Sequence, residues 1–322
     1  MRTNADYVTS RRRDMIAVAR AYYLENKSKL EIAGETGLSR FVVARLLAES
    51  RETGLVTITI NAGGVLADMS AQIRDHLGLS CALVIEAYGT VAEVRAAVGH
   101  ATGGYLGETL HSDEVLGIGW GRTVTTMIED LERLPPVDIV QLTGSIGSDA
   151  HNSAMELARR AALVSGRTPR VMFAPFYVSD VHAANVLRGQ PEAADVIGAY
   201  DHLTTAVVAV GSLCPRITQT LDRVPAETMQ ALLAAGAAAE ICGIPFAADG
   251  HVVDRRFARH CLGVSVDQLR KTPRVIAAVS DTRKANAVVA ICQSGVVDEI
   301  VVDVGLAQAI LALPAVSRTD MD

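Results

Sequence analysis

The residues best suited to chemistry lie in four loops, each of which follows an apolar run. The first loop, Gly117–Thr123, reads GIGWGRT and precedes the expected start of a helix. Its glycines let the backbone approach an oxyanion, and Arg122 and Thr123 add a charge and a hydroxyl at a helix start that attracts anions. Gly119, Gly121, Arg122 and Thr123 therefore predict a phosphate cradle, with a simple tight turn as the alternative. The spacing fits neither the dinucleotide fingerprint nor a Walker A loop.

The other three loops offer hydroxyls, a carboxylate and cations. Residues 143–145 present hydroxyls and backbone donors that suit a sugar or a phosphate, unless they form an ordinary loop. Residues 249–250 supply a carboxylate able to grip vicinal hydroxyls or, in an enzyme, to abstract a proton; an Asp-Gly turn is the alternative. In residues 280–284, Arg283 or Lys284 could neutralise the charge of an anionic ligand. The alternative is that these residues only form the solvent-exposed start of a helix. The predicted ligand positions here are Thr143, Gly144, Ser145, Asp249, Gly250 and Lys284.

No established catalytic or metal motif accompanies these loops. The sequence has no nucleophile elbow and no HExxH pair. Its five cysteines are dispersed without a CxxC pair, which indicates reduced thiols and argues against a metal site. We expect no cofactor and no metal.

Near the N-terminus, Glu31–Leu47 reads as two short helices joined by a turn at Gly37. Ser28 and Glu31 match a capping box, and Leu30, Ile32 and Ala33 are expected on the inner face of the first helix. The second helix begins at an N-cap and turns its polar face outward. This pattern is typical of a helix-turn-helix that contacts DNA. The predicted DNA-contacting residues are Lys29, Ser39, Arg40, Phe41 and Arg45, although Phe41 alternatively packs on the preceding helix.

Charge is distributed unevenly along the 322 residues. Residues 1–60 contain ten Lys/Arg and seven Asp/Glu, a balance of +3, and the remainder contains twenty and twenty-nine, a balance of −9, which sum to −6. A basic head on an acidic body fits a DNA-contacting domain joined to one that does not touch DNA. There is no apolar run of membrane-spanning length and no secretory signal at the start, so we expect a cytoplasmic protein without membrane contact.

The rest of the chain alternates between strand-like and helical patterns. Residues 137–142 and 205–210 are nearly continuous apolar runs, as strands buried on both faces must be. Strand–helix alternation over such a length predicts a doubly wound, mostly parallel α/β sheet. A further strand is expected at 170–173, whereas 211–273 reads as largely loop. Residues 55–60 alternate as a strand that is either a wing or a linker, and we place the domain boundary between residues 58 and 59.

These motifs, taken in order, resemble the SorC/DeoR-type sugar-binding transcriptional regulators. The similarity runs along nearly the whole chain. The head carries it in EIAGETGLSRFVVARLL, and the body in GIGWGRT, VQLTGSIG, NSAMELARR, EICGIPFAADGHVVD and TPRVIAAVS. Each motif is weak alone, but the ordered set is specific.

The resemblance implies an all-α, winged or helix-turn-helix domain over 1–58. It further implies an effector domain over 59–322 that also oligomerises and resembles sugar-phosphate isomerase and deaminase folds. It implies tetramers or dimers of dimers on palindromic operators, and control by a sugar, polyol or sugar phosphate. It places the phosphate side at Gly119–Thr123 and the sugar side at Thr143, Gly144, Asp249 and Lys284. The sequence departs from the family where Ser280-Asp281 replaces a common glycine pair, which keeps a neutral polyol open as the ligand.

Two functions are therefore compatible with these residues. The first is a transcriptional regulator of carbohydrate or polyol catabolism genes that binds double-stranded DNA and is not an enzyme. The alternative is a sugar-phosphate isomerase or deaminase with an accessory DNA-binding head, in which Asp249 is the base and His251 an auxiliary group. The absence of a second acid or base in a motif favours the regulator.

Overall fold

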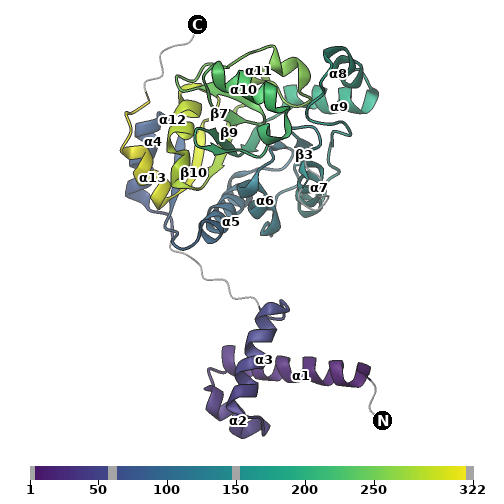
Figure 1. The fold of residues 1–322 in the computed structure, drawn as a ribbon, viewed down its shortest axis with the longest axis vertical. Coiled ribbons are helices and arrows are strands. Elements are labelled where there is room, and N and C mark those ends of the chain that lie inside the picture. Colours follow the sequence, from purple (N-terminus) through teal and green to yellow (C-terminus); the bar gives the residue numbers. More distant parts are fainter. Residues whose placement is uncertain (1–3, 57–63, 147–152, 317–322) are drawn as a thin grey trace. The chain divides into compact units, whose positions relative to one another are not determined.

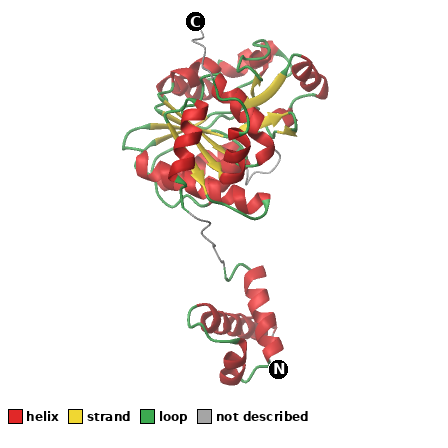
Figure 2. Ribbon diagram, turned by 90° about the vertical axis from the view of Figure 1, so that its left-hand side faces the viewer, coloured by secondary structure: helices red, strands yellow, loops and turns green. Residues whose placement is uncertain are grey.

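The computed structural model describes residues 4–56, 64–146 and 153–316, and divides into two compact units, Met1–Asn61 and Ala62–Asp322 (Figures 1 and 2). The predicted boundary at 58/59, and residues 57–60 of the predicted wing strand, lie outside the described residues. No helix in the described ranges is long and apolar enough to cross a membrane.

The first unit contains three helices, α1 (Asn4–Tyr23), α2 (Lys29–Thr36) and α3 (Arg40–Glu52). The predicted capping box at the start of α2 is confirmed, because Ser28 accepts from the Glu31 N–H and Glu31 accepts from the Ser28 N–H. Gly37 ends α2 in the left-handed conformation at φ 70°, which lets the chain turn sharply into α3. The core forms around side chains from all three helices: Met15, Val18, Ile32, Val43, Leu46 and Leu47. Leu30, which we expected inside, is 72% exposed, so that expectation was wrong.

The second unit is built on a six-stranded sheet in the order β1-β10-β9-β4-β2-β3, in which every neighbouring pair is parallel. Its strands are β1 (Cys81–Ile85), β2 (Val115–Ile118), β3 (Asp138–Gln141), β4 (Thr205–Val208), β9 (Arg274–Val279) and β10 (Glu299–Asp303). The predicted mostly parallel α/β fold is confirmed. The expected strand at 170–173 was wrong, since only Arg170 bridges to Val140 at the β3 edge.

Helices cover both faces of this sheet (Figure 1). Alternate residues of one strand enter two separate cores: in β9, Val275, Ala277 and Val279 face one core and Ile276 faces the other. This arrangement explains why the strands are apolar throughout. The first core contains residues of α4 (Ala67–Leu77), α9 (Pro191–Ala199), α11 (Val266–Lys271), α12 (Ala285–Gln293) and α13 (Val304–Leu311). The second contains residues of α5 (Val91–Thr109), α6 (Arg122–Glu129), α7 (Ala154–Ser165) and α10 (Ala226–Ala234).

Residues 210–247 form a second, antiparallel sheet in the order β6-β5-β7-β8, although 211–273 was expected to be largely loop. Its strands are β5 (Val210–Leu213), β6 (Arg216–Ile217), β7 (Ala237–Ile241) and β8 (Ile244–Ala247). A two-residue turn at Cys242 and Gly243, both at positive φ, joins β7 to β8, as expected of a tight hairpin. The remaining helix, α8 (Val181–Arg188), precedes α9.

Candidate functional site

A crevice opens at the carboxyl edge of the main sheet, between the ends of β2 and β4. The chain leaves β2 toward β3 on one side, whereas it leaves β4 in the direction of β9 on the other. Loops that diverge from neighbouring strands leave room for a ligand at such a switch point. The residues lining this crevice are Trp120–Thr123, Ala209–Gly211, Ile217–Thr220, Glu240 and Lys284.

The predicted phosphate loop forms one wall of this crevice. A Cβ at Gly121 would lie 2.5 Å from the Ala209 Cβ, so glycine is needed for the loop to run this close to the chain leaving β4. Gly121 also begins α6, and no described side chain caps that helix. The N–H groups of the first turn, beside the buried Thr123 and the exposed Arg122, are therefore placed to receive an anion.

A buried lysine and a buried glutamate form the floor of the crevice. Lys284 is 8% exposed and its Nζ donates to the Val210 carbonyl at 2.7 Å. Glu240 is 4% exposed and accepts from the Gly243 N–H and the Thr218 hydroxyl, each at 2.8 Å. Burial raises the pKa of Glu240. Burial and the nearby Arg122 lower the pKa of Lys284 to about 8, which Glu240 partly opposes.

Arg95 adds a third cation from the first turns of α5. It is half-buried, and its pKa is lowered by burial and by the charge of Arg122, while Asp281 acts in the opposite direction. Two arginines and a lysine are thus close enough to repel one another, and only part of that charge is balanced by Glu240 and Asp281. Such a cluster favours an anionic ligand.

A wider cleft lies on the other side of residues 282–284, over the ends of β1, β9 and β10. It has a volume of about 400 Å³, compared with about 20 Å³ of free space in the crevice. The cleft is lined by Ala87, Tyr88, Gly89, Val91, Val94, Asp281, Thr282, Asp303, Val304, Gly305 and Gln308. The crevice as it stands holds little more than a water molecule, so the body of a sugar fits only the cleft.

Asp281, where the resemblance implies a glycine, adopts a backbone conformation that glycine favours. Asp281 has φ 93°, a conformation that glycine adopts readily and other residues rarely, so the backbone is strained here. Its carboxylate is bound by the Arg283 guanidinium at 2.6 Å and accepts from the Arg283 N–H. The Arg283 charge is thereby balanced by its neighbour, which leaves Lys284 as the ligand-facing cation of this loop.

The second predicted loop serves mainly to join chain segments. The Gly144 N–H donates to the Leu262 carbonyl at 2.8 Å and the Ser145 N–H donates to the Ala174 carbonyl at 2.7 Å. A Cβ at Gly144 would lie 2.7 Å from the Phe176 backbone N. These N–H groups are therefore used within the protein, contrary to the expectation that they face a ligand. Only the Thr143 hydroxyl, fully buried, has no partner among the described residues.

Asp249 and Gly250 do not lie at the crevice, which corrects their predicted role. Asp249 is exposed and accepts from the His251 N–H at 3.2 Å, so the pair forms the turn that was the alternative. A Cβ at Gly250 would lie 2.5 Å from the Ser294 N, at the end of α12, whereas Lys284 precedes its start. The nine residues of α12 separate the two by about 13 Å.

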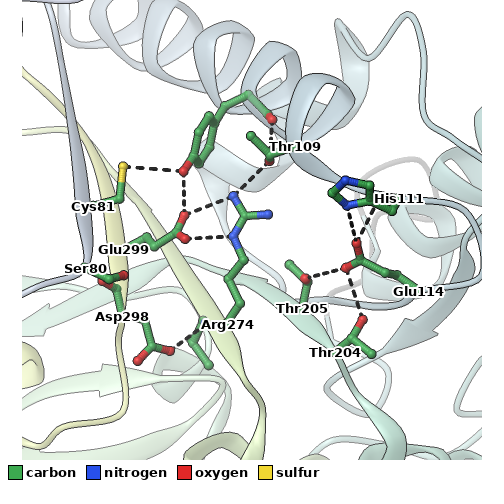
Figure 3. A network of polar contacts seen from close by, with 12 residues as sticks. Ser80, Cys81, Thr109, His111, Glu114, Thr204, Thr205, Arg274, Asp298 and Glu299 are labelled. Carbon is green, nitrogen blue, oxygen red and sulfur yellow. Dashed lines mark hydrogen bonds and ion pairs between the residues drawn. The ribbon is translucent and has the colours of Figure 1, made fainter.

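The opposite, amino-terminal edge of the sheet holds a polar network that is closed on itself (Figure 3). Arg274 at the start of β9 donates to both carboxylate oxygens of Glu299, at 2.8 and 3.0 Å, and to the Thr109 hydroxyl. Tyr105 of α5 donates to the same carboxylate at 2.8 Å. These groups satisfy one another, so they fasten the end of α5 to β9 and β10 and offer nothing to a ligand.

In the first unit, α3 presents the predicted contact face. Phe41 is 86% exposed, which contradicts packing on α1, and Arg40 and Arg45 are also exposed on this helix. Ser39 accepts from the Val42 N–H at 3.3 Å as the N-cap of α3. Lys29 is half-buried, with its Nζ 5.7 Å from the centre of the Tyr22 ring. That these residues contact DNA stays a prediction.

Glu240 and Arg95 are the site residues that sequence reasoning missed. Glu240 had a usable signal, because it is the single charged residue within the apolar run AAAEI of β7. A charge inside a buried strand needs a partner or a function. Arg95 had no such signal, since it reads as an ordinary exposed position on a helix.

Comparison with known proteins gives the family. The family model "Putative sugar-binding domain" matches residues 64–312. The chain is 30% identical to the uncharacterized transcriptional regulator YjhU of Escherichia coli K12, over 90% of this chain and 92% of that protein. It is 29% identical to the transcriptional regulator LsrR of Enterobacter sp. strain 638, over 92% of each.

Among solved structures, the full-length sorbitol operon regulator SorC of Klebsiella pneumoniae has the same fold. The TM-score is 0.71 at 22% identity, covering 93% of this chain and 98% of that one. The named relatives are transcriptional regulators, which supports the regulator over the enzyme alternative. The chain belongs to the SorC/DeoR-type family of sugar-binding transcriptional regulators.

Proposed function

We propose that this protein regulates carbohydrate or polyol catabolism genes in the cytoplasm, and that a sugar phosphate or a phosphorylated polyol controls it. The observation that carries the ligand class is the crowding of Arg95, Arg122 and Lys284 around the uncapped start of α6. A phosphate is the group that such a cluster binds best, because it brings two negative charges and several acceptors.

The crevice and the cleft bind different parts of the ligand. The phosphate binds at the mouth of the crevice, against the N–H groups at the start of α6 and beside Arg122, because the space inside holds little more than a water molecule. The hydroxylated chain lies in the 400 Å³ cleft, where the Tyr88 and Thr282 hydroxyls and the Gln308 amide offer hydrogen bonds. A neutral polyol would leave the repulsion among the three cations unrelieved, so it is the weaker candidate.

The DNA side of the proposal rests on α3. Its exposed face carries Arg40, Phe41 and Arg45, which suit guanine edges, thymine methyls and phosphates. One short helix gives weak affinity, so two or four copies of the chain act together on a palindromic operator. The ligand alters how well paired heads match their half-sites, because it binds one arrangement of the oligomer better than another.

A thermal-shift screen of sugars, polyols and their phosphates tests the ligand class. A compound at 100 times its dissociation constant stabilises the folded protein by about 2.7 kcal/mol. We expect phosphorylated compounds to shift the wild type and Arg159→Ala, which removes an exposed arginine of α7, but not Arg122→Ala. A shift with neutral polyols alone, or a phosphate-dependent shift that survives Arg122→Ala, would contradict the proposal.

A further inference from the structure

A further pocket lies between the β7–β8 hairpin, residues 252–258 and residues 261–268, and we call it the hairpin pocket. It has a volume of about 350 Å³ and shares no lining residue with the crevice or the cleft. An apolar cavity of about 150 Å³ is already large enough for a benzene molecule. Because protein interiors are usually filled as densely as organic crystals, an unfilled apolar space of this size suits a small-molecule ligand. The apolar wall is formed by Phe176, Ile197, Ile244, Val252, Phe257 and Val264.

The polar groups in the wall of the hairpin pocket already have partners. Nη2 of Arg188 donates to the carbonyls of Arg259 and Cys261, at 2.8 and 2.7 Å. Ser265 and Gln268 bind each other as the capping box of α11. These groups hold the wall together, so they do not require a polar ligand to satisfy them.

The charges around the hairpin pocket are balanced. Burial raises the pKa of the Cys261 thiol to about 12 and also raises the pKa of Cys242, so both thiols are uncharged at neutral pH. The crevice, in contrast, collects three cations. The hairpin pocket therefore suits an uncharged, largely apolar molecule and not the phosphorylated ligand of the crevice. Two cations and two carboxylates line it, a sum of zero: Arg188, Arg255, Asp254 and Asp267.

The turn between β7 and β8 lies between the hairpin pocket and the crevice. Cys242 and Gly243 line the pocket, whereas Glu240 of β7 lines the crevice. The Gly243 N–H donates to the Glu240 carboxylate at 2.8 Å. The turn also reaches the phosphate loop, because a Cβ at Gly119 would lie 3.5 Å from the Cys242 Sγ. A molecule in the pocket therefore contacts the two residues that hold Glu240 and pack against Gly119.

We propose that the hairpin pocket is a second ligand site, that it takes an uncharged, largely apolar molecule such as a bicyclic aromatic compound, and that its occupation changes the affinity of the crevice for phosphate. Two ligands influence each other when both bias one element, and the effect is reciprocal. That element is the turn at Cys242 and Gly243, which contacts both ligand sites. The second site goes beyond the proposed function, and only its effect on phosphate binding rests on that function.

Fluorine NMR of the full-length protein with 5-fluoroindole, an uncharged bicyclic probe, tests the site. We expect saturable binding to the wild type and to Ala231→Phe, the matched control, which changes an exposed alanine of α10 outside the pocket. Ala258→Phe and Ile244→Phe add a ring to the pocket wall and should weaken binding at least about tenfold. 5-Fluoroindole-2-carboxylate, which adds a negative charge, should bind more weakly than 5-fluoroindole.

Three results would each overturn the site: no saturable binding to the wild type, equal binding to the wild type and both pocket variants, or tighter binding of the carboxylate. The melting temperature of Ala258→Phe separates lost binding from unfolding, and we expect it to be unchanged because Ala258 is exposed.

Calorimetric titration with inorganic phosphate, with and without saturating 5-fluoroindole, tests the coupling. We expect the dissociation constant for phosphate to change at least about fivefold, and an unchanged constant would overturn the coupling. If phosphate binds in neither case, the proposed function fails and the coupling with it. The NMR result, obtained without phosphate, still decides whether the hairpin pocket is a ligand site.

Discussion

Lys284→Met tests whether a buried charge forms the floor of the crevice. The pKa of Lys284 is lowered from 10.5 to about 8, mainly by burial, so the folded protein holds this proton less tightly than the unfolded chain. The difference of about 2.5 pH units corresponds to roughly 3 kcal/mol at neutral pH. A lysine with a lowered pKa makes the unfolding free energy rise with pH between the folded and unfolded values, here from about 8 to 10.5.

Methionine keeps an unbranched apolar stem at this position and removes both the charge and its pH dependence. We therefore expect the unfolding free energy of the wild type to rise by about 2 to 3 kcal/mol relative to Lys284→Met between pH 7 and pH 10. Urea denaturation at several pH values, under reducing conditions, measures this difference. Lys271→Met, an exposed lysine of α11, is the matched control and should follow the wild type.

A bound phosphate raises the pKa of Lys284 again and so opposes the effect of burial. An anion beside Lys284 favours its charged form, so ligand binding takes up a proton above pH 8 and the affinity falls as the pH rises. The same pH dependence of stability in the wild type and in Lys284→Met would refute the reasoning. It would mean that the Lys284 ammonium is solvated and not confined next to the Val210 carbonyl.

Two further substitutions test the joining loop and the head. Gly144→Ala should destabilise the protein by about 1–3 kcal/mol in urea denaturation, because its methyl group meets the Phe176 backbone; a neutral effect would show that the loop has room for a ligand. Arg45→Ala should reduce the dependence of log K on log salt for a DNA duplex by about 0.9 if Arg45 contacts one phosphate, as read by fluorescence anisotropy; an unchanged slope would remove Arg45 from the phosphate contacts.

The main sheet was predictable because its strands are buried on both faces. Residues of β9 alternate between two cores, yet both are apolar, so the strand stands out as a continuous run without any knowledge of its partners. The helix starts were equally local, since Ser28 and Glu31 satisfy each other within one turn. Such features depend only on residues that are neighbours in the sequence, so they can be predicted from the sequence alone.

The antiparallel sheet was not predictable in the same way. β5 and β7 are separated by more than twenty residues, and their strands are short and rich in alanine and glycine. These segments become strands only because they pair with each other, and this pairing is not visible in the sequence. The same limit applies to the site: Glu240 lies in β7 of the antiparallel sheet and Lys284 lies between β9 of the parallel sheet and α12, so the two meet only after both sheets have formed. Asp249 shows the opposite error: its carboxylate was predicted to bind a ligand, but it accepts the His251 N–H within a local turn.

The carboxyl edge of the sheet also receives the chain that leads from the head. The Leu66 N–H donates to the Val84 carbonyl at 2.9 Å, and the Glu86 N–H donates to the Gly64 carbonyl at 3.3 Å, so residues 64–66 run antiparallel to β1. The residues that follow β1, 87–89, line the wide cleft. A ligand changes an output only through contacts that differ between its bound and free states. Two hydrogen bonds contribute little, about 1 kcal/mol each, so this attachment is weak, and it lies next to residues that line the cleft.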